Sequence, residues 1–202
     1  YVTVDGGDTW AAVGDAGSSV QQFLVEDAGG GGNQRVLAAT RAGVQVSSDE
    51  GETWAGIDPQ PPAAVNALVW LPSGNLLAGA EDGLVVGVED GRGWSWSAAG
   101  DGYCAVRIET VAAGHAANVY AGSYEHGAYA SSDEADNWVT RNLAGERLAA
   151  SVVDSEGRVF AGYTDLFRSE NQGVDWTELT WTGGERVQDL ADRLSGFLCV
   201  VE

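Results

Sequence analysis

Short apolar runs, bounded by Gly, Asn, Asp and Ser, follow one another along most of the chain. They are rich in Val, Tyr, Phe and Thr, residue types that favour strands. Residues 65–71, 106–111 and 148–153 are three of these runs. No stretch has a convincing 3.6-residue period of apolar positions, which an amphipathic helix would show. The pattern therefore predicts an all-β protein made of many short strands.

One octet that ends in Trp recurs about every 40 residues. Its clearest copy is Ser47 to Trp54, in which Asp49 stands before Gly51. Asp bonds its own backbone in turns, Gly supplies a positive φ, and the Trp ring packs on a sheet. The octet is therefore predicted to be a turn between two strands, and the copy before Trp96 is degenerate, with one extra residue. The five copies contain Asp5 and Trp10, Asp49 and Trp54, Asp90 and Trp96, Asp133 and Trp138, and Asn171 and Trp176.

A second motif precedes the octet in four repeats: a large apolar residue, two small residues and a turn. Its copies begin at Leu37, Leu77, Tyr120 and Phe160. The two motifs together give four strands in each repeat of about 40 residues, which is the arrangement of a β-propeller blade. A single propeller domain is predicted, with repeats at about 20–62, 63–101, 102–145 and 146–183, and a closing blade made of 184–202 and 1–19.

The octets resemble the BNR or Asp-box repeat, S-x-D-x-G-x-T-W. This repeat is found in sialidase-type propellers, xyloglucan-degrading glycoside hydrolases, sortilin-like receptors and a photosystem assembly factor. The resemblance covers essentially the whole chain and implies four-stranded antiparallel blades. It also implies that the Asp-box turns lie away from the usual ligand face, so that their Asp and Trp residues are structural. It implies no single activity, because unrelated functions share the fold.

The two ends of the chain predict how the ring closes. The sequence starts in a third strand, at residues 1–4, and finishes after a second strand, at residues 197–202. Two strands from each end make one more blade, which leaves no open edge between the first and last blades. We therefore favour a five-bladed ring closed by a shared blade. The alternative is a fragment of a larger array of roughly six to eight blades.

The charge balance is strongly acidic, with 30 Asp and Glu, 10 basic residues and a formal net charge of −20. All the basic residues are Arg. The acids are scattered rather than blocked, which favours a solvated halophilic surface over an acidic binding surface for a cation or a basic partner. The composition argues against nucleic acid as a partner, because nucleic acid needs a basic footprint.

Motifs for cofactor chemistry are missing from the sequence. No His and Cys cluster has metal-ligand spacing, and no G-x-G-x-x-G or G-x-S-x-G motif stands in a suitable context, so no metal or cofactor is expected. Cys104 and Cys199 lie in apolar runs and are predicted to be buried free thiols. No apolar run reaches the roughly 18 residues of a membrane helix. A monomer is expected, and the compartment is left open.

The turns between the second and third strands of the repeats are predicted to surround the ligand end of the central channel. An aromatic side chain beside carboxylates suits a sugar or a basic group, so a recognition or scaffold propeller that binds a glycan or a protein is favoured over an enzyme. The alternative is a glycoside hydrolase with paired carboxylates. Arg41, Arg147 and Arg186 lie near turns of the ligand side, but the contexts of the arginines do not repeat the triad that the sialidase resemblance implies, so these three are interpreted as solvated residues that balance an acidic surface. The candidate ligand-face residues are Arg41, Glu81, Asp82, Tyr124, Glu125, His126, Tyr163 and Asp165.

The acidic surface predicts that stability depends on salt. At about 1 M salt the Debye length falls to roughly 3 Å, which screens the repulsion between carboxylates. The melting temperature is therefore expected to fall when the protein is moved from about 2 M to about 0.05 M salt, as followed by circular dichroism. Equal melting temperatures in the two solutions would contradict the halophilic interpretation.

Overall fold

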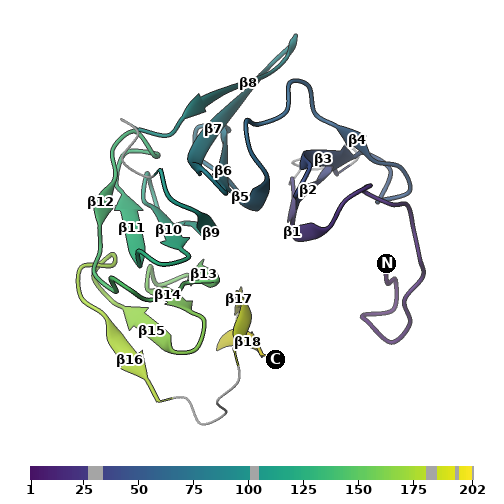
Figure 1. Ribbon diagram of the computed structural model, residues 1–202. Helices are drawn as coiled ribbons and strands as arrows, with labels where there is room; N and C mark the ends of the chain where they lie inside the picture. The colour runs from purple at the N-terminus through teal and green to yellow at the C-terminus, as the bar shows by residue number, and fades with distance from the viewer. Residues whose placement is uncertain (27–33, 101–104, 181–185, 194–195, 202) are drawn as a thin grey trace.

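The computed structural model describes residues 1–26, 34–100, 105–180, 186–193 and 196–201. The regular secondary structure in these ranges consists of β-strands, which confirms the all-β prediction. Four antiparallel sheets of four strands follow one another around a common centre, and a two-stranded sheet comes after them (Figure 1). In the described ranges no helix has the length and apolar character to cross a membrane.

Each four-stranded sheet is a meander in which every strand pairs with the next one in sequence. The first sheet contains β1 (Val20–Val25), β2 (Val36–Thr40), β3 (Gly43–Ser47) and β4 (Ala55–Gly56). The second contains β5 (Val65–Trp70), β6 (Leu76–Ala80), β7 (Gly83–Asp90) and β8 (Gly93–Ala98). The third contains β9 (Ile108–Ala113), β10 (Val119–Ser123), β11 (Ala128–Ser131) and β12 (Val139–Thr140). The fourth contains β13 (Ala150–Val153), β14 (Val159–Gly162), β15 (Leu166–Ser169) and β16 (Thr177–Leu179).

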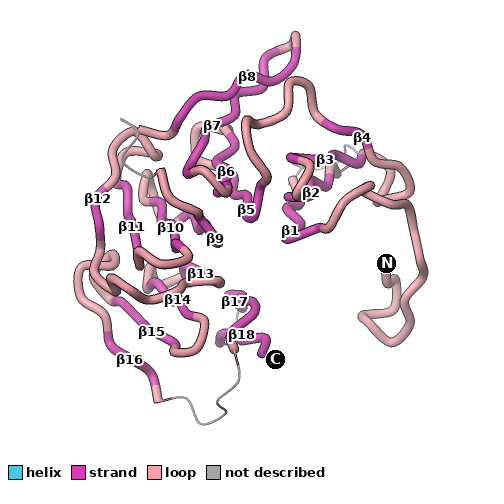
Figure 2. Tube along the Cα trace, in the orientation of Figure 1, coloured by secondary structure: helices cyan, strands magenta, loops and turns pink. Residues whose placement is uncertain are grey.

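The first strand of each sheet lies nearest the centre, and the fourth lies at the outside (Figure 2). The core is formed between neighbouring sheets: Leu37 of the first sheet and Leu68 of the second share one buried cluster. The small residues of the second strands allow this close packing. A Cβ added to Gly79 would lie 2.6 Å from Ile108 Cγ2, and one added to Gly122 would lie 2.7 Å from Leu148 Cβ. The small pair of the second motif is therefore the place where one sheet meets the next.

The turn between β3 and β4 is held by the side chains of the octet. Asp49 accepts hydrogen bonds from the backbone N–H of Thr53 at 2.9 Å and from its hydroxyl at 2.5 Å. The hydroxyl of Ser47 donates to Asp49 at 2.8 Å and accepts from Gly51 N–H at 2.9 Å. The indole N–H of Trp54 donates to the Gly51 carbonyl at 3.1 Å, which fixes the ring over the turn.

The hydrogen bonds at the first and third positions of the octet recur in three further octets, although Trp176 of the last one donates to the Arg141 carbonyl instead. Asp5, Asp133 and Asn171 each accept from the backbone N–H four residues later, at 2.8–3.0 Å. These donors stabilise the ionised carboxylates, so the pKa values of Asp5, Asp49 and Asp133 lie below the usual range. The largest cause is the side-chain hydrogen bond from Thr9, Thr53 or Asn137, respectively.

The prediction of a degenerate fifth octet at Asp90 and Trp96 is corrected by the structure. Here β7 and β8 form a longer hairpin with Asp90 paired to Gly93, so only Gly91 and Arg92 form the turn. Asp90 accepts one hydrogen bond, from Arg92 N–H at 2.9 Å. The one extra residue of this copy fits because the paired strands β7 and β8 continue through the octet instead of ending before it.

The last sheet has two strands, β17 (Val187–Arg193) and β18 (Gly196–Val201). The N-terminal octet forms its own narrow hairpin, with a single bridge between Val2 and Ala11. Figure 1 shows this hairpin and β18 apart, on either side of a gap in the ring. The shared closing blade therefore stays a prediction, and so does the burial of the thiols, because Cys104 and the side chain of Cys199 lie outside the described residues.

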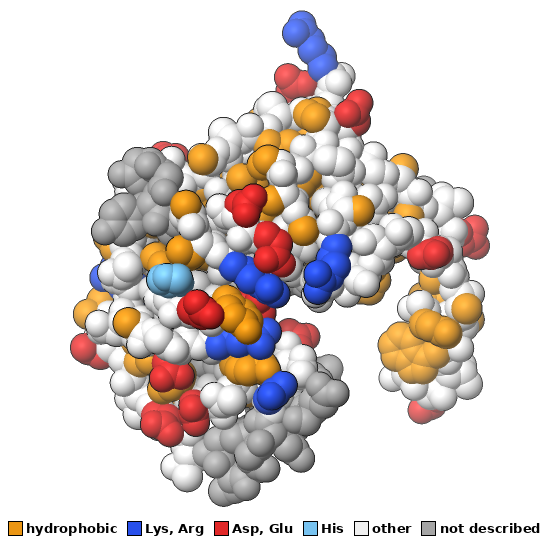
Figure 3. Space-filling view, in the orientation of Figure 1, with side chains coloured by type: hydrophobic (Ala, Val, Ile, Leu, Met, Phe, Trp, Pro, Cys, Tyr) orange, Lys and Arg blue, Asp and Glu red, His pale blue; other side chains and the backbone are white. Residues whose placement is uncertain are grey.

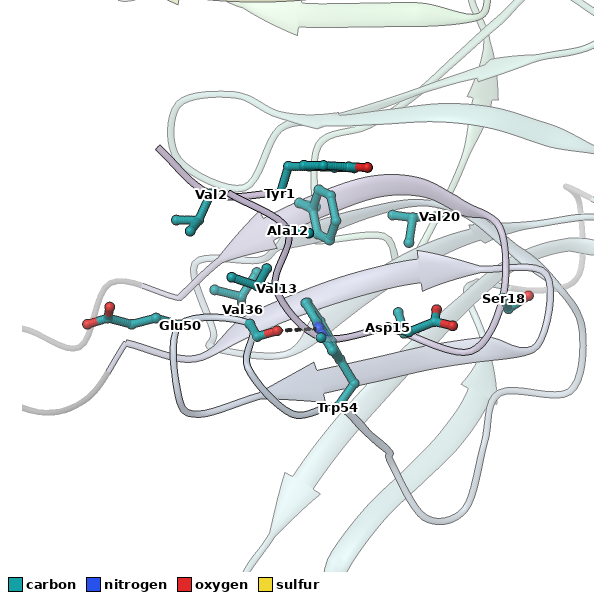
Figure 4. Close-up of a pocket in the computed structure, with 14 residues that line it drawn as sticks. Tyr1, Val2, Ala12, Val13, Asp15, Ser18, Val20, Val36, Glu50 and Trp54 are labelled. Carbon is teal, nitrogen blue, oxygen red and sulfur yellow. Dashed lines mark hydrogen bonds between the residues drawn. The ribbon is translucent and has the colours of Figure 1, made fainter. Parts of the chain in front are cut away.

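The first sheet exposes an apolar face toward this gap. Phe23 packs on Trp54, with ring centroids 5.8 Å apart, and its side chain remains 57% exposed. A cavity of about 520 Å³ lies between this face and the N-terminal segment, with Tyr1 and Val13 on the other side (Figure 4). In the second sheet the position of Phe23 is taken by Leu68, which is 1% exposed because the first sheet covers it.

The Asp49 network predicts a difference between Asp49→Ala and Asp90→Ala. Losing Asp49 leaves the donors of Thr53 without their acceptor, so the melting temperature should fall by a few degrees, whereas Asp90→Ala should change it by roughly a degree or less. Both variants remove one negative charge, so general electrostatics is matched. Equal melting temperatures for the two variants would contradict the structural role of the octet.

The same network predicts how the effect of Asp49→Ala depends on pH. A carboxyl whose folded pKa is lowered stabilises the fold above its unfolded pKa, about 3.9, and this contribution is lost as the pH falls through the folded pKa. The difference in melting temperature between the wild type and Asp49→Ala should therefore be largest at neutral pH and shrink below about pH 4. A difference that is constant between about pH 7 and pH 2 would show that the charge of Asp49 has no part in it.

Candidate functional site

The turns after the second strands and the segments before the first strands lie at the same end of the ring. Backbone hydrogen bonds connect them: Tyr124 N–H donates to the Arg107 carbonyl at 3.1 Å, and Val187 N–H donates to the Tyr163 carbonyl at 2.6 Å. The octet turns lie at the opposite end of their strands, where the third strands finish. The end that carries Tyr124 and Tyr163 is therefore the face predicted for a ligand.

Three arginines and two tyrosines alternate across this face; we call them the arginine–tyrosine cluster. The guanidinium of Arg107 lies 5.0 Å from the ring centre of Tyr124, and Arg147 lies 4.7 Å from the same ring. Arg147 also lies 4.1 Å from the ring centre of Tyr163, which Arg186 approaches at 5.3 Å. In Figure 3 blue and orange side chains alternate in this way near the centre of the face.

The repeat explains why these side chains meet. Arg107, Arg147 and Arg186 each stand directly before the buried residue that begins the first-strand run of their repeat, Ile108, Leu148 and Val187. Each is therefore placed at the channel end by the same local fold. Tyr124 and Tyr163 lie in the turns after β10 and β14, so they fall between successive arginines.

Two carboxylates neutralise part of the cluster. Glu109, whose side chain is 9% exposed, contacts Arg147 at 2.8 Å and Arg107 at 2.5 Å. Glu81 contacts Arg107 at 3.5 Å. In the part of the chain that the structure describes, no carboxylate contacts Arg186. The three guanidinium groups and the two carboxylates that contact them carry one net positive charge, in a protein whose formal net charge is −20. Glu125 and Asp165 are exposed on the same turns, outside these contacts.

The geometry of the cluster suits an anion with a planar face. A guanidinium that lies over an aromatic ring is held in place by the ring and still presents N–H donors at its edge. Such donors form paired hydrogen bonds with a carboxylate. The tyrosines supply apolar contact area beside them, so the patch can bind a carboxylate together with neighbouring apolar atoms.

The structure places the candidate residues predicted from the sequence in three different surroundings. Tyr124, Tyr163 and Glu81 belong to the cluster or contact it. Arg41, Glu125, His126 and Asp165 are exposed on the turns of this face, and among the described residues no hydrogen bond, ion pair or ring contact joins their side chains to the cluster. Asp82 lines a separate small cavity of about 160 Å³ beside Leu84 and Ala98.

Sequence reasoning missed Arg107 and Glu109, and it treated Arg147 and Arg186 as solvated surface residues. A signal was present, because Arg stands at the same place in three successive repeats. The five residues alternate along the sequence as well, but 16 to 23 residues separate each from the next, so only the stacked sheets show that their side chains meet.

The central channel is a polar cavity of about 600 Å³ lined by the first strands of the five sheets. Its side chains connect neighbouring sheets. Asn66 donates to the Ile108 carbonyl at 2.8 Å, and the hydroxyls of Thr110 and Ser151 are 2.8 Å apart. These polar residues are engaged in holding the first strands together, so the channel differs in character from the positive cluster at its mouth.

Comparison with solved structures defines the class of fold. The chain superimposes on the extracellular domain of the putative one component system BT4673 from B. thetaiotaomicron with a TM-score of 0.72 and 15% identity, over 90% of this chain and 25% of that one. YCF48 from Cyanidioschyzon merolae gives 0.67 and 13%, over 98% and 72%. Virginiamycin B lyase from Staphylococcus aureus, solved in an inactive form with quinupristin, gives 0.70 and 12%, over 96% and 66%. YCF48 has also been solved bound to a D1 peptide.

These are β-propeller proteins, and the four four-stranded sheets of this chain are consistent with propeller blades. No protein-family model and no curated protein sequence matches the chain. The likeness at 12–15% identity is one of fold. The chain spans about a quarter of the BT4673 domain, about two thirds of the lyase chain and 72% of the YCF48 chain.

Proposed function

We propose that this chain is a recognition propeller that binds a carboxylate-bearing segment of a partner protein at the arginine–tyrosine cluster. The observation that carries the proposal is the alternating stack of Arg107, Tyr124, Arg147, Tyr163 and Arg186 at the mouth of the channel. Three of the ten arginines gather here, and such a concentration of guanidinium groups on an acidic protein suits the recognition of an anion. The likeness to YCF48, which has been solved with a bound peptide, supports a polypeptide ligand rather than a glycan.

A glycoside hydrolase is the weaker alternative, although the lyase shows that this fold also carries enzymes. A general acid needs a raised carboxyl pKa. Among the described residues, the carboxyl groups whose pKa departs clearly from its ordinary value are Asp5, Asp49, Glu89, Asp133 and Asp154, and in each it is lowered. On the channel face, Glu81 and Glu109 contact arginine, and neither forms a pair with a second carboxylate among the described contacts.

The proposal includes the Asp-box character of the repeats and the halophilic character of the surface. Four turns share one side-chain network built on the residues that the S-x-D-x-G-x-T-W pattern names. The scattered carboxylates and the exclusive use of Arg support a surface adapted to high salt. We also propose that the sheets form one domain and that the protein is a monomer.

We further propose that β17 and β18 and the N-terminal hairpin belong to one closing blade. The first pair lacks the two outer strands of a blade, and the hairpin around Asp5 has the octet turn that joins such strands. Closure would cover the apolar face that now shows Phe23 and Trp54.

Peptide binding tests the recognition site. The probe is a fluorescein-labelled peptide of Glu and Leu residues with a free C-terminus, compared with the same peptide carrying Gln for Glu and a C-terminal amide. Arg147→Ala should weaken anisotropy-measured binding of the acidic peptide by about 10-fold or more, since it removes charge-assisted hydrogen bonds and two ring contacts. Arg147→Lys should restore it only in part, because an ammonium lacks the planar pair of donors.

Arg92→Ala is the matched control, because Arg92 is exposed on a hairpin tip and its loss changes the net charge equally. It should bind the acidic peptide as the wild type does. Equal weakening by Arg92→Ala and Arg147→Ala would show that only the overall field attracts the peptide. Binding of oligosaccharides but of neither peptide would overturn the choice of a polypeptide ligand.

Phe23→Ala tests ring closure. If another blade covers this position in solution, the variant should lower the free energy of unfolding by about 3–5 kcal/mol, as for a core phenylalanine. If the face stays open, only the contact with Trp54 is lost, and a change of about 1 kcal/mol is expected. Val139→Ala on the exposed strand β12 is the control and should change it by less than about 0.5 kcal/mol.

A further inference from the structure

The second sheet differs from the other three in its outer strand. The fourth strands β4, β12 and β16 have 2, 2 and 3 residues, whereas β8 has 6. Its hairpin with β7 projects beyond the ring, at the top of Figure 1. This follows from the turn at Gly91 and Arg92, because the paired strands continue where the other repeats have an octet.

The projecting strand β8 has a free edge. It pairs with β7 alone in its sheet. Ala99 N–H donates inward to the Leu84 carbonyl at 2.9 Å, so by the two-residue alternation of a strand the N–H groups of Trp94, Trp96 and Ala98 point outward. Trp94 N–H is satisfied by the Asp58 carbonyl at 3.1 Å. The outward backbone groups of Trp96 and Ala98 make no backbone hydrogen bond to another described segment, so they are available to an added strand.

A groove runs along one face of this hairpin. It has a volume of about 570 Å³ and lies between β7 and β8 on one side and the octet turn of the third sheet on the other. Val86, Val88 and Ser97 belong to the hairpin side, and the side chain of Val88 is 39% exposed. The floor is therefore partly apolar and next to the free edge.

The opposite wall of the groove is acidic. Asp133, Glu134 and Asp136 line it, and no described residue that lines the groove is basic. The pKa of Asp133 is lowered by hydrogen bonds from Asn137, so that carboxylate stays charged over the physiological range. The wall therefore attracts cationic side chains from whatever lies along β8.

We propose that β8 is a docking edge for an extended segment of a partner protein that carries Arg or Lys at alternate positions. The segment pairs with the backbone of Trp96 and Ala98 as a fifth strand of the second sheet. Every second side chain then points into the groove, toward Asp133 and Asp136, because side chains alternate along a strand. Backbone pairing supplies affinity, and the acidic wall selects basic residues. This site is separate from the arginine–tyrosine cluster and does not depend on the function proposed for it.

The experiment uses the full chain and a fluorescein-labelled peptide of alternating Arg and Val residues. Ala98→Pro removes the outward N–H of an exposed edge position and leaves the β7 pairing in place, which edge strands tolerate. Ala98→Val keeps that N–H and favours a strand. The two variants have the same charge as the wild type, so electrostatic attraction to the acidic protein is equal in all three.

We expect Ala98→Pro to weaken peptide binding by about 10-fold or more and Ala98→Val to leave it within about 2-fold. A peptide of alternating Glu and Val should bind at least about 10-fold more weakly to the wild type, because the groove wall repels it. Equal affinity of wild type and Ala98→Pro for the Arg peptide would overturn the proposal. So would a dimer of the wild type that Ala98→Pro abolishes, because the edge would then serve a second copy of the chain.

Amide hydrogen exchange of the wild type gives a readout that no substitution disturbs, in case Ala98→Pro fails to fold. The Arg peptide should slow exchange at Trp96 and Ala98 by about 10-fold or more and leave the outer strand β12 unchanged. Protection spread evenly over the acidic surface, with none at these two amides, would refute strand addition.

Discussion

The packing of each sheet on the next is the interaction on which the rest of this structure depends. A single four-stranded sheet with short strands cannot bury its own apolar faces, so stability comes from stacking successive sheets. The second strands make the stacking possible because they carry small residues at the contact, such as Gly79 against Ile108. Once the sheets are stacked around a centre, the turns at one end converge, and the face with the tyrosines and arginines follows from that convergence.

Much of this architecture could be predicted because short local motifs specify each repeat. The octet carries its own turn chemistry in Ser47, Asp49 and Thr53, and the network does not need distant partners. The second motif marks the buried strand. The prediction from the octet pattern was wrong at Asp90 and Trp96, where most of the expected turn residues belong to paired strands. Strand pairing depends on the partner strand as well as on the octet.

The candidate site could be predicted only in part. Tyr124, Tyr163 and Glu81 were found because turns can be located from the sequence, and turns carry ligand contacts. Arg107 and Glu109 were missed because their role comes from contacts between different sheets, 38 residues or so apart for Arg147 and Glu109. Charge composition pointed the other way, since an overall charge of −20 hides a small positive patch. The closing of the ring depends on contacts between the two ends of the chain, which no local motif specifies.

The stacking also determines where the molecule begins to unfold. Contacts between sheets join each first strand to the first strand of the next sheet: β1 to β5, β5 to β9, β9 to β13 and β13 to β17. Such an assembly is close to one-dimensional, with energy held in nearest-neighbour interfaces. The inner sheets have two interfaces and the outermost ones have one. Without the proposed closing blade, opening is therefore cheapest at the two ends of the row, β1 and β17. Formation of that blade would give these two sheets a second interface, so the free energy of opening at the ends would approach that of the β5–β13 region.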